Sequence, residues 1–144
     1  LLAYSLSSIA SFWVLLLVSE KSGEEDITAF NGLVKRNPVL AGTMTIALLS
    51  MAGIPPLAGF FAKYFILINV IDKGYILIAV VAILASLIGV YYYFKIIIAM
   101  FTGTAEDTSS IEVPVFYKVV LVLISIILLA VGVVPDLIFS LIFR

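Results

Sequence analysis

Lys63 is the residue of this chain whose type and position best suit proton chemistry. It lies in a long apolar stretch, roughly 13 Å of helix before the polar turn Asp72-Lys73-Gly74. A lysine stem reaches about half that distance, so the amine cannot readily extend to the membrane surface, as lysines near helix ends do. Ionisable side chains inside a membrane are costly to insert and by default suggest function. We therefore predict that Lys63 takes up and releases protons.

The sequence also predicts a break in the helix that carries this lysine. Residues 39–71 would form a straight helix about 50 Å long, against a hydrocarbon core of about 30 Å. Within them, Gly53-Ile54-Pro55-Pro56 removes two amide donors and relaxes the backbone. Interrupted helices occur in membranes where the freed groups face protein or a cavity, and they often mark ion or substrate sites. Gly53, Pro55 and Pro56 are therefore predicted to shape the site.

Both features also have a purely structural interpretation. Lys63 could bond carbonyl groups freed at the break, or pair with an acidic residue on a helix outside this chain, since no acid of the chain is expected at its depth. The break could be a simple proline kink that serves packing. Because the two features lie only about two helical turns apart, we favour proton transfer through hydrated cavities as the use of both.

The composition fixes the class of protein and excludes several kinds of chemistry. Hydrophobic residues make up 64% and charged residues 12% of the 144 positions, which is typical of a membrane protein. The chain has no cysteine and no histidine, and so lacks thiols and the commonest ligands of transition metals. A net charge of −1 offers no basic face for nucleic acid. No cofactor or metal site is predicted within this chain.

The predicted fold is an all-α membrane protein with about four transmembrane elements, one of them the broken helix. An amphipathic helix at the interface is expected in the first loop, because Ile27, Phe30, Leu33 and Val34 recur there at helical spacing. The predicted elements are a helix at 1–19, a loop with the amphipathic helix at 20–38, the broken helix at 39–71, a helix at 75–101, a loop at 102–114, and a helix at 115–134 closed by Pro135-Asp136.

Small residues and basic residues complete the pattern. The first helix has a serine stripe and the third a stripe of small residues, both interpreted as packing faces, and Tyr91-Tyr92-Tyr93 is interpreted as an interface anchor. Most Lys and Arg residues flank the loops at 20–38 and 102–114, which are therefore predicted to face the cytoplasm. The stripes are Ser5, Ser8 and Ser11, and Ala82, Ser86 and Gly89. Without an initiator Met or a cleavage site, the chain is expected to be part of a longer protein.

A family resemblance lies in the run NGLVKRNPVLAGTMTIALLSMAGIPPLAGFFAKYFIL, which begins at Asn31. It resembles the proton-pumping antiporter-like membrane subunits of respiratory complex I over essentially the whole chain, as the C-terminal part of a larger membrane domain. The GIPP-x-x-GF-x-x-K core, which includes Gly59, is shared with subunits of Mrp-type antiporters and membrane-bound hydrogenases. Arg36-Asn37-Pro38 and Lys63-Tyr64 favour the subunit N branch of the bacterial NADH-quinone oxidoreductases.

The resemblance implies a role for this chain and for its surroundings. Lys63 would be the terminal proton-transfer residue of a half-channel, and its relay partners would lie on helices outside the chain. The chain would be a non-redox subunit, with NADH, FMN, iron–sulfur clusters and quinone in partner subunits, in a bacterial inner membrane. Two alternatives stay open at this point: a subunit of a Mrp-type Na⁺/H⁺ antiporter or of a membrane-bound hydrogenase, and a structural scaffold.

Overall fold

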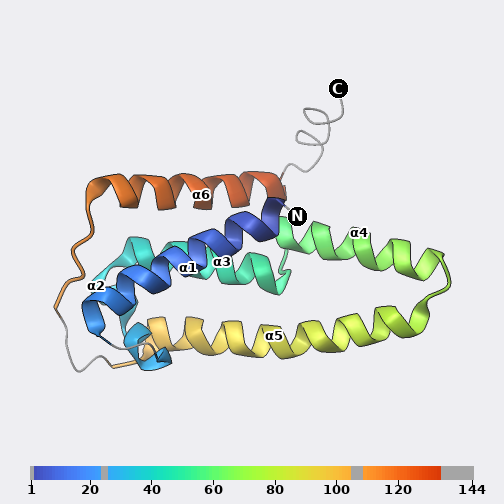
Figure 1. Cartoon of the computed structure of the whole chain (residues 1–144), viewed down its shortest axis with the longest axis horizontal. Coiled ribbons are helices and arrows are strands. Elements are labelled where there is room, and N and C mark those ends of the chain that lie inside the picture. The colour runs from blue at the N-terminus through green and yellow to red at the C-terminus, as the bar shows by residue number, and fades with distance from the viewer. Residues whose placement is uncertain (1, 24–25, 105–108, 134–144) are drawn as a thin grey trace.

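The computed structural model describes residues 2–23, 26–104 and 109–133, and no strand occurs within those ranges (Figure 1). The predicted all-α class is confirmed. Three described helices are long and apolar enough to cross a membrane, α1, α5 and α6, and α3 is a shorter apolar helix. The elements in order are α1 (Leu2–Ser22), the 3₁₀ helix η1 (Ile27–Phe30), α2 (Leu33–Arg36), α3 (Pro38–Ala52), α4 (Ala58–Asp72), α5 (Ile76–Thr102) and α6 (Val115–Val133).

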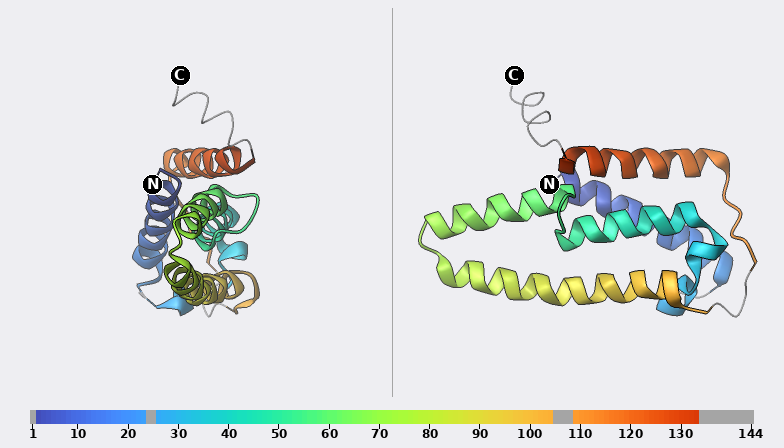
Figure 2. Two further views of the ribbon diagram at one scale, coloured as in Figure 1. Left: turned by 90° about the vertical axis from the view of Figure 1, so that its right-hand side faces the viewer. Right: turned by 180° about the vertical axis from the view of Figure 1, so that it is seen from behind.

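The helices lie side by side along one direction, with α3 at the centre. It contacts α1, α2, α4, α5 and α6, and the right-hand view of Figure 2 shows it in the middle of the bundle with one face toward the viewer. A helix that is apolar on all sides is expected in the interior, and Leu40, Ala41, Met44 and Leu48 of α3 are buried. Its central place puts the end of α3 within reach of residues from α1, α4 and α6.

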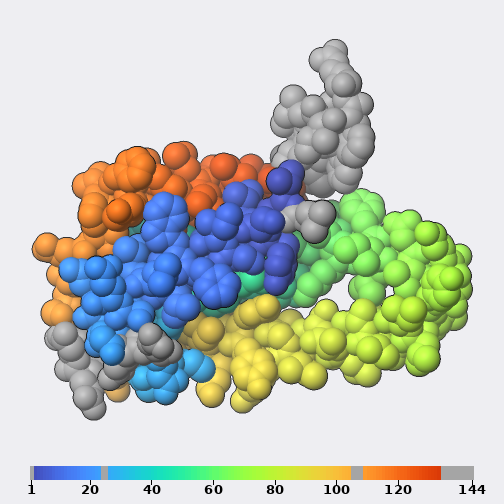
Figure 3. Space-filling model, in the orientation of Figure 1, coloured from blue at the N-terminus to red at the C-terminus, as the bar shows by residue number. Residues whose placement is uncertain are grey.

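The long helix α5 and its neighbour α4 are much less covered. They project beyond the ends of α1 and α6 as a helical hairpin (Figure 1). Leu77 is 77% exposed and Tyr91 65% exposed. Figure 3 shows an opening between α4 and the first half of α5 that no described residue fills. Apolar surface of this extent belongs against lipid or against other protein.

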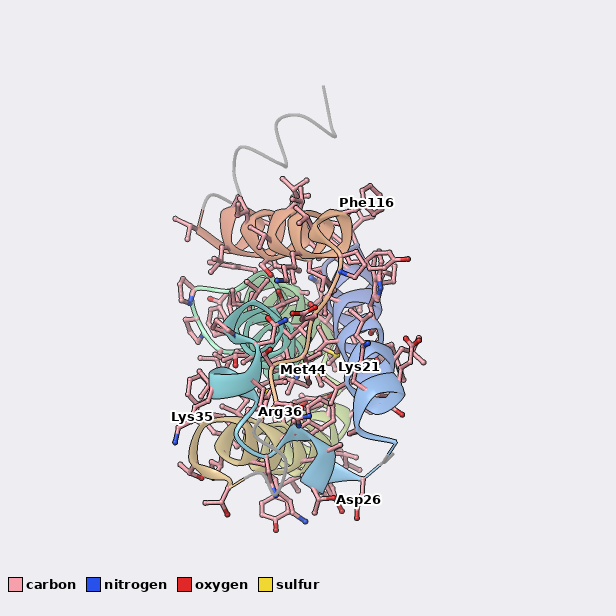
Figure 4. All side chains as sticks on the ribbon, turned by 90° about the vertical axis from the view of Figure 1, so that its left-hand side faces the viewer. Lys21, Asp26, Lys35, Arg36, Met44 and Phe116 are labelled. Carbon is pink, nitrogen blue, oxygen red and sulfur yellow. The ribbon has the colours of Figure 1, made fainter. Side chains whose placement is uncertain are left out.

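Arg36 and Asn37 hold together the end of the bundle where the loops gather. Arg36 is buried and donates from Nη1 to Ala29 O at 3.3 Å and from Nε to Ser109 O at 3.4 Å. Asn37 Nδ2 donates to Ile111 O at 2.9 Å. Figure 4, which looks along the bundle from this end, shows Arg36 near the middle and Lys35 pointing outward. The α2–α3 junction thus binds the segment that leads into α6.

The loop between α1 and α3 differs from the sequence prediction. The single amphipathic helix expected there is not confirmed, and the described residues form η1 and α2 instead. Gly32 lies between them with φ of +64°, a conformation that ends a helix, and Asp26 accepts from the Ile27 amide at the start of η1. Phe30 and Leu33 are buried against the bundle.

The end of α1 falls elsewhere than predicted, and the predicted end of the last helix is not tested. α1 continues to Ser22, beyond the predicted end at residue 19, because Glu20 and Lys21 are good helix formers and the break in helical geometry comes only at Gly23, with φ of +71°. The predicted end of the last helix at Pro135-Asp136 lies outside the described residues.

Asn37→Ala should destabilise the protein through two separate losses. The Asn37 side chain accepts from the Val39 and Leu40 amides, so its removal uncaps α3 at a cost of about 0.5–2 kcal/mol. It also leaves the buried Ile111 O without its donor, which costs about 1–3 kcal/mol more. The thermal unfolding midpoint of the full-length protein in detergent should fall. The midpoint of Asn37→Ser, which keeps a capping oxygen, should fall less. Equal midpoints for the three proteins would contradict this role.

Candidate functional site

The centre of the candidate site is the interruption between α3 and α4, at residues 53–57. α3 ends with Gly53 at φ of +82°, where the Gly53 and Ile54 amides donate back to Leu49 O at 3.1 Å each. This is the arrangement in which a left-handed glycine satisfies the last carbonyls of a helix. Pro55 and Pro56 have no amide to satisfy, and the Leu57 amide donates to Ile54 O at 3.0 Å. The interruption therefore leaves few backbone groups in need of a partner.

Lys63 provides the partner for one of those groups. From the second turn of α4, its side chain folds back to α3, and Nζ donates to Ala52 O at 3.0 Å. A cationic side chain at the last carbonyls of a helix is favourable both as a hydrogen bond and against the helix dipole. This contact is the one that the structural interpretation of Lys63 expects.

Gly53 is required for the lysine as well as for the backbone. A Cβ added at Gly53 would lie 2.9 Å from Lys63 Cδ and 3.5 Å from Nζ. Contacts under about 3.0 Å force a neighbour to move, and the positive φ would itself be strained for any residue with a Cβ. Any other residue at position 53 would thus displace the Lys63 stem from the position in which Nζ donates to Ala52 O.

Two further glycines allow helices to meet at the interruption. A Cβ at Gly59 of α4 would overlap the carbonyl oxygen of Ser50, and one at Gly132 of α6 would overlap the carbonyl oxygen of Pro56. Small residues of this kind let helix backbones approach closely in membranes. The end of α3, the start of α4 and the end of α6 therefore converge at the interruption.

Lys63 lies between two cavities. One, of about 240 Å³, is on the side of α1 and α3; the other, of about 230 Å³, separates α4 from α5. Each is large compared with the roughly 30 Å³ that a water molecule occupies in the liquid. The first is lined by Tyr4, Ser7, Ser50, Met51, Gly59, Ala62, Lys63 and Ile66. The second has Ala52, Gly53, Phe60, Tyr64, Leu67, Ile83, Ser86, Leu87 and Val90 beside Lys63.

No acidic side chain accompanies the lysine in the part of the chain that is described. Neither cavity is lined by Asp or Glu, and Lys63 forms no ion pair with a described carboxylate. The described ranges also contain no group of three or more His, Cys, Asp or Glu residues that could hold a metal ion. What the site offers is an amine, hydroxyl groups and free space.

The structure brings together some of the predicted site residues and adds others that the sequence did not predict. Gly53 and Gly59 lie beside Lys63 or in the same cavity, while Pro55 and Pro56 are exposed. Tyr4, Ser7 and Ser50 were not predicted. Ser7 could have been found from its spacing, because it shares a face of α1 with other buried residues, Ala10, Ser11, Val14 and Val18.

The predicted small-residue stripes are only partly used for packing. Ser5 is exposed, whereas Ser8 donates to Met51 Sδ at 3.8 Å and Ser11 to Ser8 O at 3.0 Å. On α5, Ala82 is exposed and no described helix covers it. The α1 face therefore packs on α3, whereas on α5 Ala82 is left open and Ser86 borders the cavity beside α4.

Comparison with known proteins gives the class of this membrane protein. Residues 1–89 match the family described as NADH:quinone oxidoreductase/Mrp antiporter, transmembrane. The chain belongs to this family of antiporter-like membrane subunits, as the motif around Lys63 predicted, and it is an integral membrane protein.

Particular relatives narrow the resemblance to one subunit. The chain is 47% identical over 139 residues to NADH-quinone oxidoreductase subunit N of Flavobacterium psychrophilum, and 40% identical over 138 residues to that of Cytophaga hutchinsonii. These matches cover 96% and 94% of this chain, and 30% of each relative's length. The predicted similarity to subunit N is confirmed.

A solved structure has the same fold. The chain matches, with a TM-score of 0.79 and 27% identity, a chain in the structure of respiratory complex I from Thermus thermophilus with bound aureothin. The match covers 96% of this chain and 33% of that one. In both comparisons the chain spans about a third of the length of the protein that it matches.

Gly59→Ala should disturb the meeting of α3 and α4. The added methyl group overlaps the Ser50 carbonyl oxygen, which cannot rotate away, and overpacking of this kind costs about 1–3 kcal/mol or more. Gly42→Ala is the matched control, because nothing lies within 4 Å of a Cβ at Gly42 of α3. The amount of assembled protein in membranes and its thermal unfolding midpoint should fall for the first variant only. If both variants have the same amount of assembled protein and the same unfolding midpoint, the claim of close contact between α3 and α4 at Gly59 is wrong.

Proposed function

We propose that this chain is part of a proton-translocating membrane subunit of NADH:quinone oxidoreductase, with Lys63 as a proton-transfer residue. The observation that supports it best is the position of the Lys63 amine, at an interruption between helices and between two cavities large enough for water. A lysine that served only to cap α3 needs the bond to Ala52 O but needs no space on either side.

In this proposal α3 and α4 together form one membrane crossing with a break near its middle. α3 and α4 have 15 residues each, about 22 Å of helix, too short to span a core of about 30 Å alone. Water in either cavity could exchange a proton with the amine, while the bond to Ala52 O holds the stem in place. The protonated Lys63 side chain has three N–H donors, so it can keep that bond and still bond water.

The proposal assigns the remaining parts of the activity to other chains and to the rest of this protein. Without cysteine this chain offers no thiolate ligands for an iron–sulfur cluster, so NADH, FMN, iron–sulfur clusters and quinone are proposed for partner subunits. Its partners would be neighbouring membrane subunits of the complex. The chain would lie in a bacterial inner membrane, with the ends of α1 and α5 toward the cytoplasm, and would be a non-redox subunit.

A secondary Na⁺/H⁺ antiporter subunit is the second candidate, because the matching family includes Mrp antiporters. It predicts exchange that needs no NADH and responds to sodium. In inverted membrane vesicles containing the full-length protein, we expect proton uptake to start on addition of NADH and quinone and to be unchanged when sodium is replaced by choline. Sodium-driven proton movement without NADH would favour the antiporter instead.

Lys63→Met in the intact complex should abolish most proton pumping. Methionine keeps the length of the side chain but cannot exchange a proton, so we expect the rate of pumping to fall by about a hundredfold, as for loss of an acid–base group. Vesicles supplied with NADH and quinone would be compared by a fluorescent pH-gradient dye and by NADH oxidation.

Lys95→Met provides the matched control, since Lys95 lies on α5, is exposed and borders neither cavity beside Lys63. It should pump as the parent does. Assembly of both variants would be checked by native gel electrophoresis. Normal pumping by an assembled Lys63→Met complex would mean that the lysine is structural and that the proposed role is wrong.

A further inference from the structure

The last turn of α6 contacts the backbone of the interruption between α3 and α4. A Cβ at Gly132 would overlap Pro56 O. It would also lie 2.6 Å from Leu57 C and 2.7 Å from Ala58 N. Figures 1 and 2 show the end of α6 beside the start of α4. Backbone atoms cannot rotate away from an added methyl group as side chains can, so a larger residue at position 132 would force the backbone itself to shift.

A pair of hydroxyl groups fixes where α6 lies along α3. The buried residues of α6 share one face, because they recur every three or four residues: Leu121, Ser125, Leu128 and Gly132. Ser125 is the polar residue of that face, and its Oγ lies 3.3 Å from Oγ1 of Thr43, which is buried on α3. A polar pair inside an apolar helix contact favours one register, since other registers lose the bond. A slip of one helical turn would place Leu128 where Gly132 lies, and its side chain would not fit.

The other described neighbours of α4 leave space beside Lys63. One cavity, of about 240 Å³, lies on the side of α1 and α3, and another, of about 230 Å³, separates α4 from α5. Leu57 and Ala58, by contrast, are buried at the point where Gly132 comes closest to them. The start of α4 is therefore held closely by α6 and, at Gly59, by α3.

The hydrogen bond of Lys63 depends on how the start of α4 lies against the end of α3. Lys63 is on α4, Ala52 is the last residue of α3, and the 3.0 Å bond from Nζ to Ala52 O spans the interruption. Contacts along its buried face anchor α6 on α3, so a methyl group added at position 132 would push on residues 56–58 and on α4 behind them. A shift of about 1 Å would take Nζ out of hydrogen-bond range of Ala52 O.

We propose that α6 is a fixed support that positions Lys63, with Ser125 setting its register on α3 and Gly132 supporting the start of α4. Ser125 and Gly132 are thereby positioning residues, which act on Lys63 through the backbone of residues 56–58. α6 keeps this register while the complex works. The effect on pumping rests on the proposed function of Lys63, whereas the position of the amine can be measured separately.

Gly132→Ala in the intact complex should move Lys63 Nζ out of hydrogen-bond range of Ala52 O, as seen by cryo-electron microscopy of parent and variant. The number of protons pumped per NADH oxidised should fall between about tenfold and a hundredfold, since misplacing a reacting group by about 1 Å can cost as much. Loss of structure alone would lower the amount of assembled complex but not this ratio. Gly42→Ala is the control, because nothing lies within 4 Å of a Cβ there, and it should keep both parental values.

The two measurements separate this inference from the proposed function. An unchanged distance from Nζ to Ala52 O in assembled Gly132→Ala overturns the inference, whatever Lys63→Met does. A lengthened distance with normal pumping by Gly132→Ala and loss of pumping in Lys63→Met also overturns it, because the position that α6 gives the amine would not matter for transfer. A lengthened distance with normal pumping by both variants agrees with positioning by α6 and overturns the proposed function of Lys63.

A cross-link covers the case in which Gly132→Ala does not assemble. Thr43→Cys with Ser125→Cys places sulfur atoms where hydroxyl oxygens lie 3.3 Å apart, so a disulfide should form on mild oxidation and be found by mass spectrometry of the joined peptides. Thr45→Cys with Ser125→Cys should not cross-link, because Thr45 lies on nearly the opposite side of α3 from Thr43. The cross-linked complex should pump as it does after reduction. Failure of the disulfide to form, or pumping that returns only on reduction, overturns the inference.

Discussion

The arrangement of this protein depends on one constraint, that backbone groups inside a membrane need partners within the protein. The interruption between α3 and α4 is where the chain meets this constraint most sharply. The left-handed Gly53 lets two amides bond back to Leu49 O, and the two prolines have no amide to place. Lys63 supplies the donor for Ala52 O. A polar, ionisable group is therefore fixed at the interruption by the backbone itself.

The structural and functional interpretations of Lys63 share that hydrogen bond and differ over the space around it. A capping lysine is best served by close packing, since voids forfeit contacts. Here cavities of about 240 and 230 Å³ lie on either side of the amine. The glycine contacts at Gly59 and Gly132 bring three helices together at the interruption. Close backbone contact therefore lies beside space that opens to the surface of the described helices.

The uncovered surface of α4 and α5 fits the size of the relatives. The chain spans about 30% of the length of the subunit N proteins that it resembles. Ala82 on α5 is exposed, and small residues of this kind let another helix approach closely. No described carboxylate lines either cavity beside Lys63.

The sequence alone showed that the chain is a membrane protein, indicated its family, and identified Lys63 as the candidate residue. Composition and the lengths of apolar runs decide membrane insertion because the bilayer sets the length of a crossing, and the GIPP-x-x-GF-x-x-K spacing carries the family likeness. Only the tertiary structure decided which groups surround Lys63. In the sequence, Ser50 and Ser7 resemble other serines in helices. The predicted single amphipathic helix is divided at Gly32 into η1 and α2, and Phe30 and Leu33 are buried against the bundle. Periodicity in the sequence shows which residues share a helix face. Which of those faces surround the Lys63 amine depends on how α1, α3 and α4 cross. That crossing is set by contacts between residues far apart in the chain, which periodicity does not show.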